Sequence, residues 1–471
     1  MPNGKTAVLS CLILFLTLFL VAHAAAPAET SIVDFGAVGD GKTVNTKSIQ
    51  AAIDHVAAAG GGLLIVPKGT FMSGALFFKQ GVNLRVEKDG VLKGTTVQAD
   101  YPLVKTRWEG VEGMHTSAFI NFTDMTHVTV DGEGMIDGSG DAFPRGRRRG
   151  GAGGGVAGGG GGASGGGAGR DANDQTPNGQ TPATRPARQS AGATTRFVFQ
   201  QVGRPRLICF QNCQDIHISD LHLQKQAIWC LHLLYSRDVV VDNITIRSTI
   251  YIPSSDGIDV DSCDRVLIKK CDIACTDDDI AIKSGKDDDG RRVNRPSQNI
   301  TIQDCTMGTG DGIAMGSEVT GSVRHVLVER CTFNGTSHCA RIKSEPSRGG
   351  EISEIVFRDI TLKDAGEAFD FELSWNMRLE RAAASSTLTL CHDVQLINFT
   401  GTSRAVGTVI GYATQPISDV KFVNCRIAAE RGLRMLYATN VDTSGLNTKV
   451  QQGPAIITGA AAASQPFKLP T

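Results

Sequence analysis

A short pattern of alternating apolar residues recurs through most of this chain and restricts the fold more than any other feature. Each copy has two apolar residues separated by a polar one, then a polar break and another apolar pair. Eight copies have their first apolar residue at Ile216, Val239, Val266, Ile300, Val326, Ile355, Val394 and Val420, at spacings of 23 to 39 residues. Short β-rich repeats with irregular loops are typical of a solenoid whose coils stack strand upon strand. The pattern predicts an all-β parallel β-helix, since the regular leucines of leucine-rich repeats are missing.

The N-terminal residues 1–24 have the composition of a secretory signal peptide. Lys5 precedes an apolar run from Ala7 to Val21, and small residues stand at both cleavage positions of Ala22-His23-Ala24. A membrane anchor is the alternative, but the run is shorter than the roughly 20 apolar residues that span a bilayer. We therefore predict a secreted or periplasmic protein with no membrane association after cleavage.

We expect residues 25–471 to form a single β-helix domain that begins with a short capping helix. Asn45 or Thr46 can cap this helix. Its apolar face, which would cover the open end of the stack, consists of Ile49, Ala52, Ile53 and Val56.

A Gly- and Arg-rich segment at about 145–195 interrupts the repeats. Gly150–Gly169 contains 14 glycines in 20 residues, a composition that cannot bury a core, so we predict a disordered insertion. Its arginines could hold an acidic polymer by electrostatic attraction, although a solvated loop needs no partner.

Overall charge bears on the possible binding partners, and the cysteine positions bear on disulfides and structural metals. With 47 basic and 48 acidic residues the net charge is -1, which indicates no nucleic-acid partner. The repeat places Cys271, Cys305, Cys331 and Cys425 at one equivalent position. This arrangement favours buried, unpaired cysteines over a disulfide or zinc framework.

An ionisable residue stands just ahead of four consecutive predicted strands. Asp256, Asp278 and Asp311 each lie two residues before an apolar strand position, and His338 has the matching place in the fourth unit. Because stacked strands are about 4.8 Å apart, these side chains should form a stripe along one face.

Asp277 and Asp278 give this stripe its most specific chemical feature. The period of two places Asp277 outward, whereas Asp278 is exposed only if the chain bends there. Inverting hydrolysis of a glycosidic bond uses two carboxyl groups roughly 6.5–9.5 Å apart, which neighbouring coils can supply. Close carboxylates also raise one pKa and keep a general acid protonated. The plainer alternative is that such aspartates only bond turn backbone.

Two cations follow the stripe on the coil after Asp311. Arg341 and Lys343 suit a substrate that carries carboxylates, such as a uronic-acid polymer. Together with the aspartates, they predict a site that cleaves an acidic carbohydrate.

At these residues the chain resembles the polygalacturonases and their relatives in glycoside hydrolase family 28. The family's NTD, DD, GHG and RIK motifs correspond to Ser254–Asp256, Asp277–Asp278, Gly310–Gly312 and Arg341–Lys343, and the resemblance covers most of Ser31–Ile427. It implies an inverting hydrolase on a right-handed parallel β-helix. It also implies that no metal or organic cofactor is needed.

The same resemblance implies a role for each matched residue. Asp277 would be the general acid, and Asp256 and Asp278 would hold and activate the water. Arg341 and Lys343 would bind a substrate carboxylate.

Two departures from the family pattern bear on the substrate. Ser-Ser-Asp replaces NTD and keeps the carboxylate, whereas Gly-Asp-Gly replaces GHG, so that Asp311 stands where the family has a histidine. A negative charge there should disfavour a neighbouring galacturonate and favour a modified pectin. His338 could replace the lost imidazole in substrate binding, although a structural role is the simpler interpretation. We expect Asp279 and Glu318 to support the site or its turns.

The predicted function is hydrolysis of an acidic plant cell-wall polysaccharide, pectin or galacturonan, by a monomeric enzyme. A rhamnogalacturonan hydrolase of the same family is an alternative. A pectate-lyase-like enzyme would use calcium and an Arg or Lys base, and would release products that absorb in the ultraviolet. A non-catalytic glycan-binding β-helix would bind without creating reducing ends.

Overall fold

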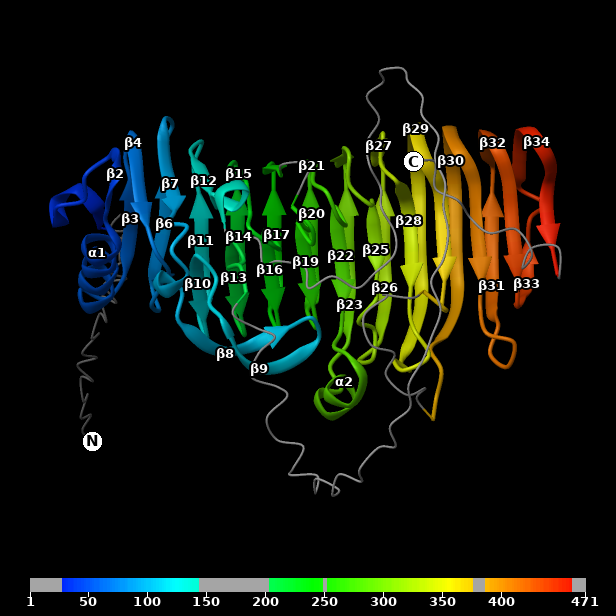
Figure 1. Ribbon diagram of the computed structural model, residues 1–471, viewed down its shortest axis with the longest axis horizontal. Coiled ribbons are helices and arrows are strands. Elements are labelled where there is room, and N and C mark those ends of the chain that lie inside the picture. The colour runs from blue at the N-terminus through cyan, green and yellow to red at the C-terminus, as the bar shows by residue number, and fades with distance from the viewer. Residues whose placement is uncertain (1–27, 144–202, 249–251, 376–385, 460–471) are drawn as a thin grey trace, which may run out of the picture.

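The computed structural model describes residues 28–143, 203–248, 252–375 and 386–459. The predicted signal peptide, residues 1–24, and the predicted insertion at about 145–195 lie outside these residues. Within the described part, successive coils pair in parallel and form one elongated stack (Figure 1). The fold is the predicted right-handed parallel β-helix.

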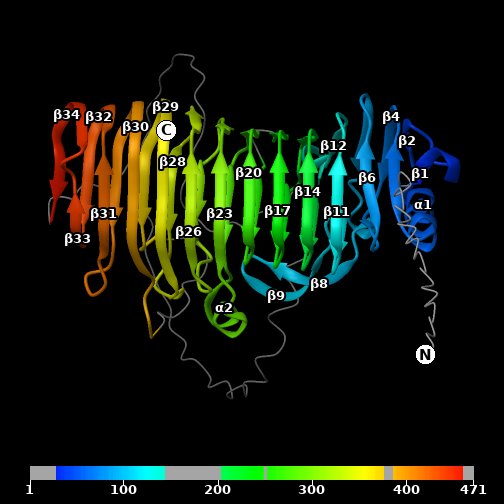
Figure 2. The same cartoon turned by 180° about the vertical axis from the view of Figure 1, so that it is seen from behind.

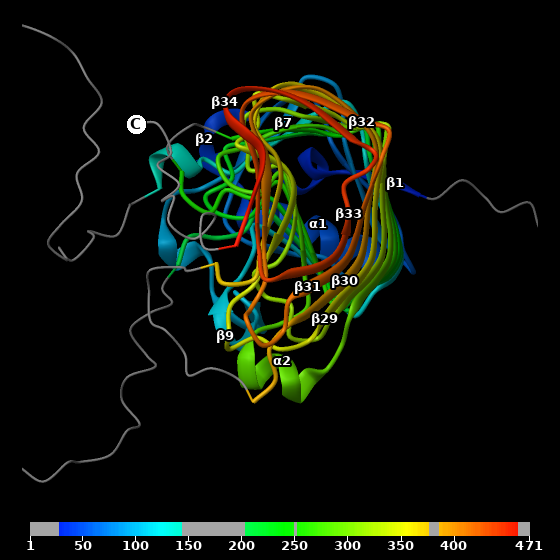
Figure 3. The same ribbon diagram turned by 90° about the vertical axis from the view of Figure 1, so that its right-hand side faces the viewer.

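Each coil contributes a strand to up to three columns, which enclose the core when the stack is viewed along its long axis (Figure 3). The first column, seen from behind in Figure 2, contains β1 (Glu29–Ser31), β3 (Gly62–Val66), β6 (Val82–Val86), β11 (Thr126–Asp131), β14 (Gln214–Ser219), β17 (Arg237–Asp242), β20 (Asp264–Lys269), β23 (Ser297–Gln303), β26 (Val323–Glu329), the starts of β29 (Glu351–Glu372) and β30 (Leu390–Ile410), β31 (Ile417–Val423) and β33 (Ala438–Asp442).

The second column contains β2 (Asp40–Val44), β4 (Gly69–Ser73), β7 (Gly90–Gly94), β12 (Met135–Asp137), β15 (His222–Gln224), β18 (Thr245–Arg247), β21 (Asp272–Ala274), β24 (Thr306–Met307), β27 (Thr332–Asn334), the middle of β29 and β30, and the starts of β32 (Cys425–Leu436) and β34 (Leu446–Thr458). The third column contains β5 (Leu76–Phe77), β10 (Ile120–Thr123), β13 (Ile208–Gln211), β16 (Leu231–Leu234), β19 (Ile258–Asp261), β22 (Ile280–Lys283), β25 (Ile313–Met315), β28 (His338–Lys343) and the ends of β29, β30, β32 and β34.

The sequence repeats predict the register of the first column correctly. Ile216 pairs with Val239, and each later pattern residue pairs with the next, as far as Val394 with Val420. The residue just before each pattern residue is skipped by the ladder and turns left-handed, as at Asp238 and Asn299 with φ of 57° and 56°. Short polar side chains tolerate this conformation best. Asp or Asn stands at five of these eight positions, and Arg265, His325 and Glu354 stand at the other three.

Several elements lie outside the regular coils. The helix α1 (Thr46–Ala58) covers the N-terminal end of the stack, and its predicted apolar face is buried. Short 3-10 helices occur at η1 (Ile32–Phe35), η2 (Gln98–Asp100) and η3 (Gly140–Ala142). An antiparallel hairpin of β8 (Leu103–Trp108) and β9 (Val111–Thr116) runs along the outside of the coils to a second helix, α2 (Asp287–Val293) (Figure 1).

All eleven cysteines within the described residues are buried and free. Cys271, Cys305 and Cys331 lie on consecutive coils, and the backbone N–H of Cys271 donates to Sγ of Cys305 at 3.4 Å. The thiols thus pack as small apolar groups, as the repeat predicts. Among the described helices, none is long and apolar enough to cross a membrane.

Candidate active site

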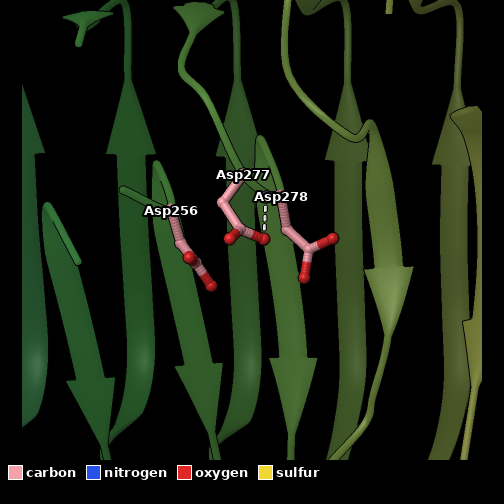
Figure 4. A group of neighbouring side chains, drawn as sticks. All are labelled: Asp256, Asp277 and Asp278. Atoms are coloured by element: carbon pink, nitrogen blue, oxygen red, sulfur yellow. Dashed lines mark hydrogen bonds between the residues drawn. The ribbon is translucent and has the colours of Figure 1, made fainter. Parts of the chain in front are cut away.

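Three aspartates meet at the point where the strands of the third column begin. Asp256 precedes β19, whereas Asp277 and Asp278 precede β22 on the next coil. One carboxylate oxygen from each lies within 4.8 Å of the other two, and the three side chains project toward one space (Figure 4). The backbone N–H of Asp278 donates to Oδ1 of Asp277 at 3.0 Å.

The chain bends at these residues, as the position of Asp278 requires. Asp279 turns inward instead: its carboxylate is fully buried and accepts hydrogen bonds from the N–H of Gly312 at 3.1 Å and the thiol of Cys275 at 3.3 Å. Burial raises the pKa of Asp279 well above its usual value. Asp279 therefore fixes the bend, which frees Asp278 to face the cations.

Both predicted cations contact Asp278. Lys343 Nζ lies 2.6 Å from Oδ2 of Asp278, and Nη1 of Arg341 lies 3.7 Å from its Oδ1. Arg341 also contacts Asp311 at 2.8 Å through Nη1 and Asp370 at 3.3 Å through Nε. Asp278 is thus a carboxylate between two positive charges, a state in which it can accept a proton.

Asp311 is not the isolated negative charge that its sequence position indicates. Burial opposes its ionisation, yet His338 and Arg341 hold the pKa of Asp311 below its usual value. His338 Nδ1 lies 3.8 Å from Asp311, and its Nε2 lies 3.7 Å from Asp370. His338 therefore supports the carboxylates that surround Arg341, and the charge of Asp311 is balanced.

Lys283 is a central residue of the site that the sequence motifs do not single out. Its Nζ lies 3.6 Å from both Asp256 and Asp259 and 3.3 Å from Glu318. It also lies 4.8 Å from the centre of the Trp229 ring. Asp256 and Asp259 belong to one coil, whereas Trp229 and Glu318 come from loops elsewhere in the chain, so no local motif joins all four. The alternation of side chains along the paired strands β19 and β22 places Lys283 and Asp259 on the same face. This alternation is the one sequence feature that indicates their proximity.

Asp370 is a second residue of the site that the sequence motifs do not single out. Its neighbours Phe369 and Phe371 are fully buried, so Asp370 faces outward, in register with Arg341 on the preceding coil. The alternation of aromatic and acidic residues in this segment would have indicated its orientation.

The carboxyl groups of the site have unlike protonation tendencies. Burial, then the neighbouring Asp278, raises the pKa of Asp277. Burial, then Asp259 and Asp277, raises the pKa of Asp256 well above its usual value. A protonated acid beside a cation-bound carboxylate is the arrangement that acid–base hydrolysis needs.

The nearest oxygens of the three carboxylates are close together. One oxygen each of Asp256, Asp277 and Asp278 lies within 4.8 Å of the other two, because two of these residues are adjacent and the third lies only one coil away. Such oxygens could also share a cation, although Lys343 and Lys283 already place ammonium groups beside them. Separation alone therefore does not fix the stereochemistry of cleavage.

Two family models match the chain. The model described as glycosyl hydrolases family 28 matches residues 178–448, and one described as rhamnogalacturonase A/epimerase, pectate lyase-like, matches residues 30–139. The first match includes every residue of the candidate site.

Similar curated proteins include a probable polygalacturonase of Vitis vinifera, 29% identical over 353 residues, or 72% of this chain and 62% of the relative. An exo-poly-alpha-D-galacturonosidase of Dickeya chrysanthemi is 27% identical over 352 residues, or 72% and 56%. The chain thus spans less than two thirds of the length of these relatives.

Solved structures with the same fold include a hyperthermoactive exopolygalacturonase from Thermotoga maritima, with a TM-score of 0.68 and 26% identity over 88% of this chain and 93% of that one. A polygalacturonase from Erwinia carotovora has a TM-score of 0.57 and 18% identity over 93% and 98%.

Proposed function

This chain belongs to glycosyl hydrolase family 28, and from that premise we propose that it hydrolyses galacturonosyl linkages in an acidic pectic polysaccharide. The observation that carries the proposal is the contact of Asp278 with Asp277 on one side and with Lys343 on the other. It brings together the carboxyl group of Asp277, whose pKa is raised, a second carboxyl group and a cation.

Each aspartate has a distinct part in the proposed reaction. Asp277 gives its proton to the glycosidic oxygen as the bond to the anomeric carbon breaks. Asp278, which contacts Lys343, takes a proton from the attacking water, and Asp256 orients that water as a carboxylate. We infer inversion from the family, because the water and the acid act on opposite faces of the sugar.

The cations support an acidic substrate. Lys343 and Arg341 supply positive charge beside the reacting bond, where a sugar carboxylate would otherwise be repelled by the aspartates. Because Asp311 is paired with Arg341, its charge does not stand alone against a galacturonate. We therefore propose homogalacturonan ahead of rhamnogalacturonan.

The test is a side-by-side digestion of homogalacturonan and rhamnogalacturonan. We expect new reducing ends on homogalacturonan without ultraviolet-absorbing products, and proton NMR should show that the first product has the inverted anomer. Ultraviolet absorbance would establish a lyase, and cleavage of rhamnogalacturonan alone would establish the alternative hydrolase. Binding without new reducing ends would leave a glycan-binding protein, and a retained anomer would make one aspartate a nucleophile.

We also propose that the protein is exported and acts as a monomer. Export rests on the composition of residues 1–24, which lie outside the described residues. N-terminal sequencing of the mature protein should begin after Ala24, and light scattering should give the mass of one chain.

A further inference from the structure

The β8–β9 hairpin reaches from the N-terminal coils to the candidate active site. Trp108 pairs with Val111 across a two-residue turn, in which Glu109 and Gly110 have φ of 43° and 79°. Left-handed conformations at both positions are typical of a tight type I′ hairpin. In Figure 1 the hairpin runs past β10, β13 and β16 toward α2.

The hairpin is fixed to the outward side of the third column. Arg107 is fully buried, and its Nη1 lies 2.8 Å from both Oδ1 of Asp261 and Oγ of Ser262. Arg206 reaches the same place, where its Nη1 lies 2.6 Å from Nδ1 of His232 and donates to the carbonyl of Arg107 at 3.4 Å. The outward faces of β16 and β19 are therefore occupied by protein and not open to a polymer.

Two tryptophans close the space between this hairpin and the catalytic coils. The ring of Trp108 lies 4.4 Å from that of Trp229, which comes from the loop before β16. Trp229 in turn lies against the ammonium of Lys283. Lys283 also contacts Asp256. The aromatic pair is therefore connected to the candidate catalytic aspartates through Lys283.

The turn of the hairpin touches the site by a second route. The carbonyl of Gly110 accepts a hydrogen bond from the N–H of Lys286 at 3.0 Å. A Cβ on Gly110 would lie 2.9 Å from Cγ of Glu318, so the backbone passes directly over this side chain. Glu318 also contacts Lys283, and both routes from the hairpin therefore end at the same ammonium.

Toward β32, the outward positions continue through Arg341, Asp370, Thr408 and Arg434, each in register with the next. Arg341, Asp370 and Thr408 are buried, and the ring of Trp375 lies 5.1 Å from the ammonium of Lys343. These groups belong to the coils or directly follow a strand of the third column, whereas the hairpin lies outside the regular coils and crosses the column only on the side of β16.

We propose that the β8–β9 hairpin is an end wall of the substrate groove, so that the protein takes its polysaccharide by one chain end, with Trp108 and Glu109 contacting the terminal sugar. This inference rests on the proposed function. Burial, then Glu318, raises the pKa of Glu109, which suits it to donate a hydrogen bond to a sugar hydroxyl. Trp108 supplies an apolar surface for the ring.

The product pattern of the unaltered protein is the first test. On homogalacturonan, a chain-end enzyme releases one short product from the earliest time points, and the viscosity of the solution falls slowly. A ladder of intermediate lengths with a rapid fall in viscosity would overturn the end wall while leaving the proposed hydrolysis intact.

A binding test removes the dependence on turnover. The Asp277→Asn protein should bind galacturonan chains of defined length in calorimetry with one protein per chain, whatever the length. A stoichiometry that grows with chain length would contradict the end wall. Absence of both binding and cleavage on every pectic polymer would instead refute the proposed function.

Variants of the hairpin assign the terminal contacts. Glu109→Asn creates an Asn-Gly turn, which suits the observed backbone, so the fold should persist while kcat/KM falls on the order of tenfold through loss of a hydrogen bond. Trp108→Ala should let intermediate-length products appear. Met114→Ala is the matched control, because Met114 is 58% exposed on the same hairpin. Unchanged kinetics and products in both test variants would refute the assignment.

Discussion

Asp277 is the residue on which the proposed chemistry most directly depends. Asp277→Asn keeps the shape and removes the proton, so turnover should fall by roughly 10²–10⁴-fold while substrate still binds. Activity and binding are measured separately on the polymer that the unaltered protein cleaves. Near-normal turnover would reassign the acid.

The pH dependence follows from the same carboxyl group. A general acid must be protonated, so activity is lost as the pH rises through its pKa. Because the pKa of Asp277 is raised, the alkaline limb of the pH–rate profile should lie above the usual range of an aspartic acid. The Asp277→Asn protein should lack this limb.

Lys283 balances three buried carboxyl groups, and its removal should affect both fold and catalysis. Lys283→Met leaves Asp256, Asp259 and Glu318 without their shared ammonium. Breaking such a buried pairing costs about 3–5 kcal/mol, which thermal unfolding will detect. Lys283 lowers the pKa of Asp256, so this pKa should rise further in the variant. Because Asp256 orients the attacking water as a carboxylate, the acidic limb of the pH–rate profile should move to higher pH.

Lys283→Arg is the control for this prediction, since it keeps the charge. It should recover the position of the acidic limb in part. An acidic limb that is the same in the Met and Arg variants would show that Lys283 acts through packing alone.

The sequence predicts the aspartates of the site better than their surroundings. Asp256 and Asp278 follow from the repeat, because each stands a fixed distance before an inward-facing residue of a paired strand. The contact of Lys283 with Glu318 does not follow, because Glu318 lies in a loop after β25, far from Lys283 in the sequence. The balance of charge at Asp311 could not be predicted either, since it depends on the reach of Arg341 across one coil.

Helix α1 shows how an element can be predicted correctly for partly the wrong reason. Asn45 precedes the helix as expected, yet its side chain makes no capping hydrogen bond. It accepts from the N–H of Val38 at 2.7 Å and donates to the carbonyls of Val38 and Thr43 at 3.0 and 2.8 Å. Asn45 therefore ties the preceding loop to the helix.

This arrangement predicts a local effect of substitution. Asn45→Ala should lower the stability by roughly 1–3 kcal/mol, because buried backbone groups of the loop lose their partners. Thermal unfolding measures the change, and activity at low temperature should be unaffected. Thr46→Ala, at the first helical residue, serves for comparison. Equal stability of the unaltered and Asn45→Ala proteins would show that water replaces the side chain.

Across the whole molecule, the exact pairing of consecutive repeats means that each coil is stabilised mainly by its neighbours. An insertion between coils is tolerated where its own residues contribute no core. We therefore predict that deleting residues 145–195, whose composition cannot bury a core, leaves the melting temperature nearly unchanged. Calorimetry of the shortened protein tests this, and insoluble protein or a large fall in melting temperature would show that the segment packs on the coils.

The eleven cysteines of the described residues are buried and free, so this part of the fold is held together without a disulfide. Burial raises the pKa of the thiols of Cys263, Cys339 and Cys391 to about 12, and the pKa of Cys331 is lowered by its contact with Cys305. A buried thiol without thiolate character neither exchanges nor oxidises readily. Refolding from urea should therefore give the same yield with and without a reducing agent. The described part of a chain built this way can reach its native state in a reducing or an oxidising compartment alike.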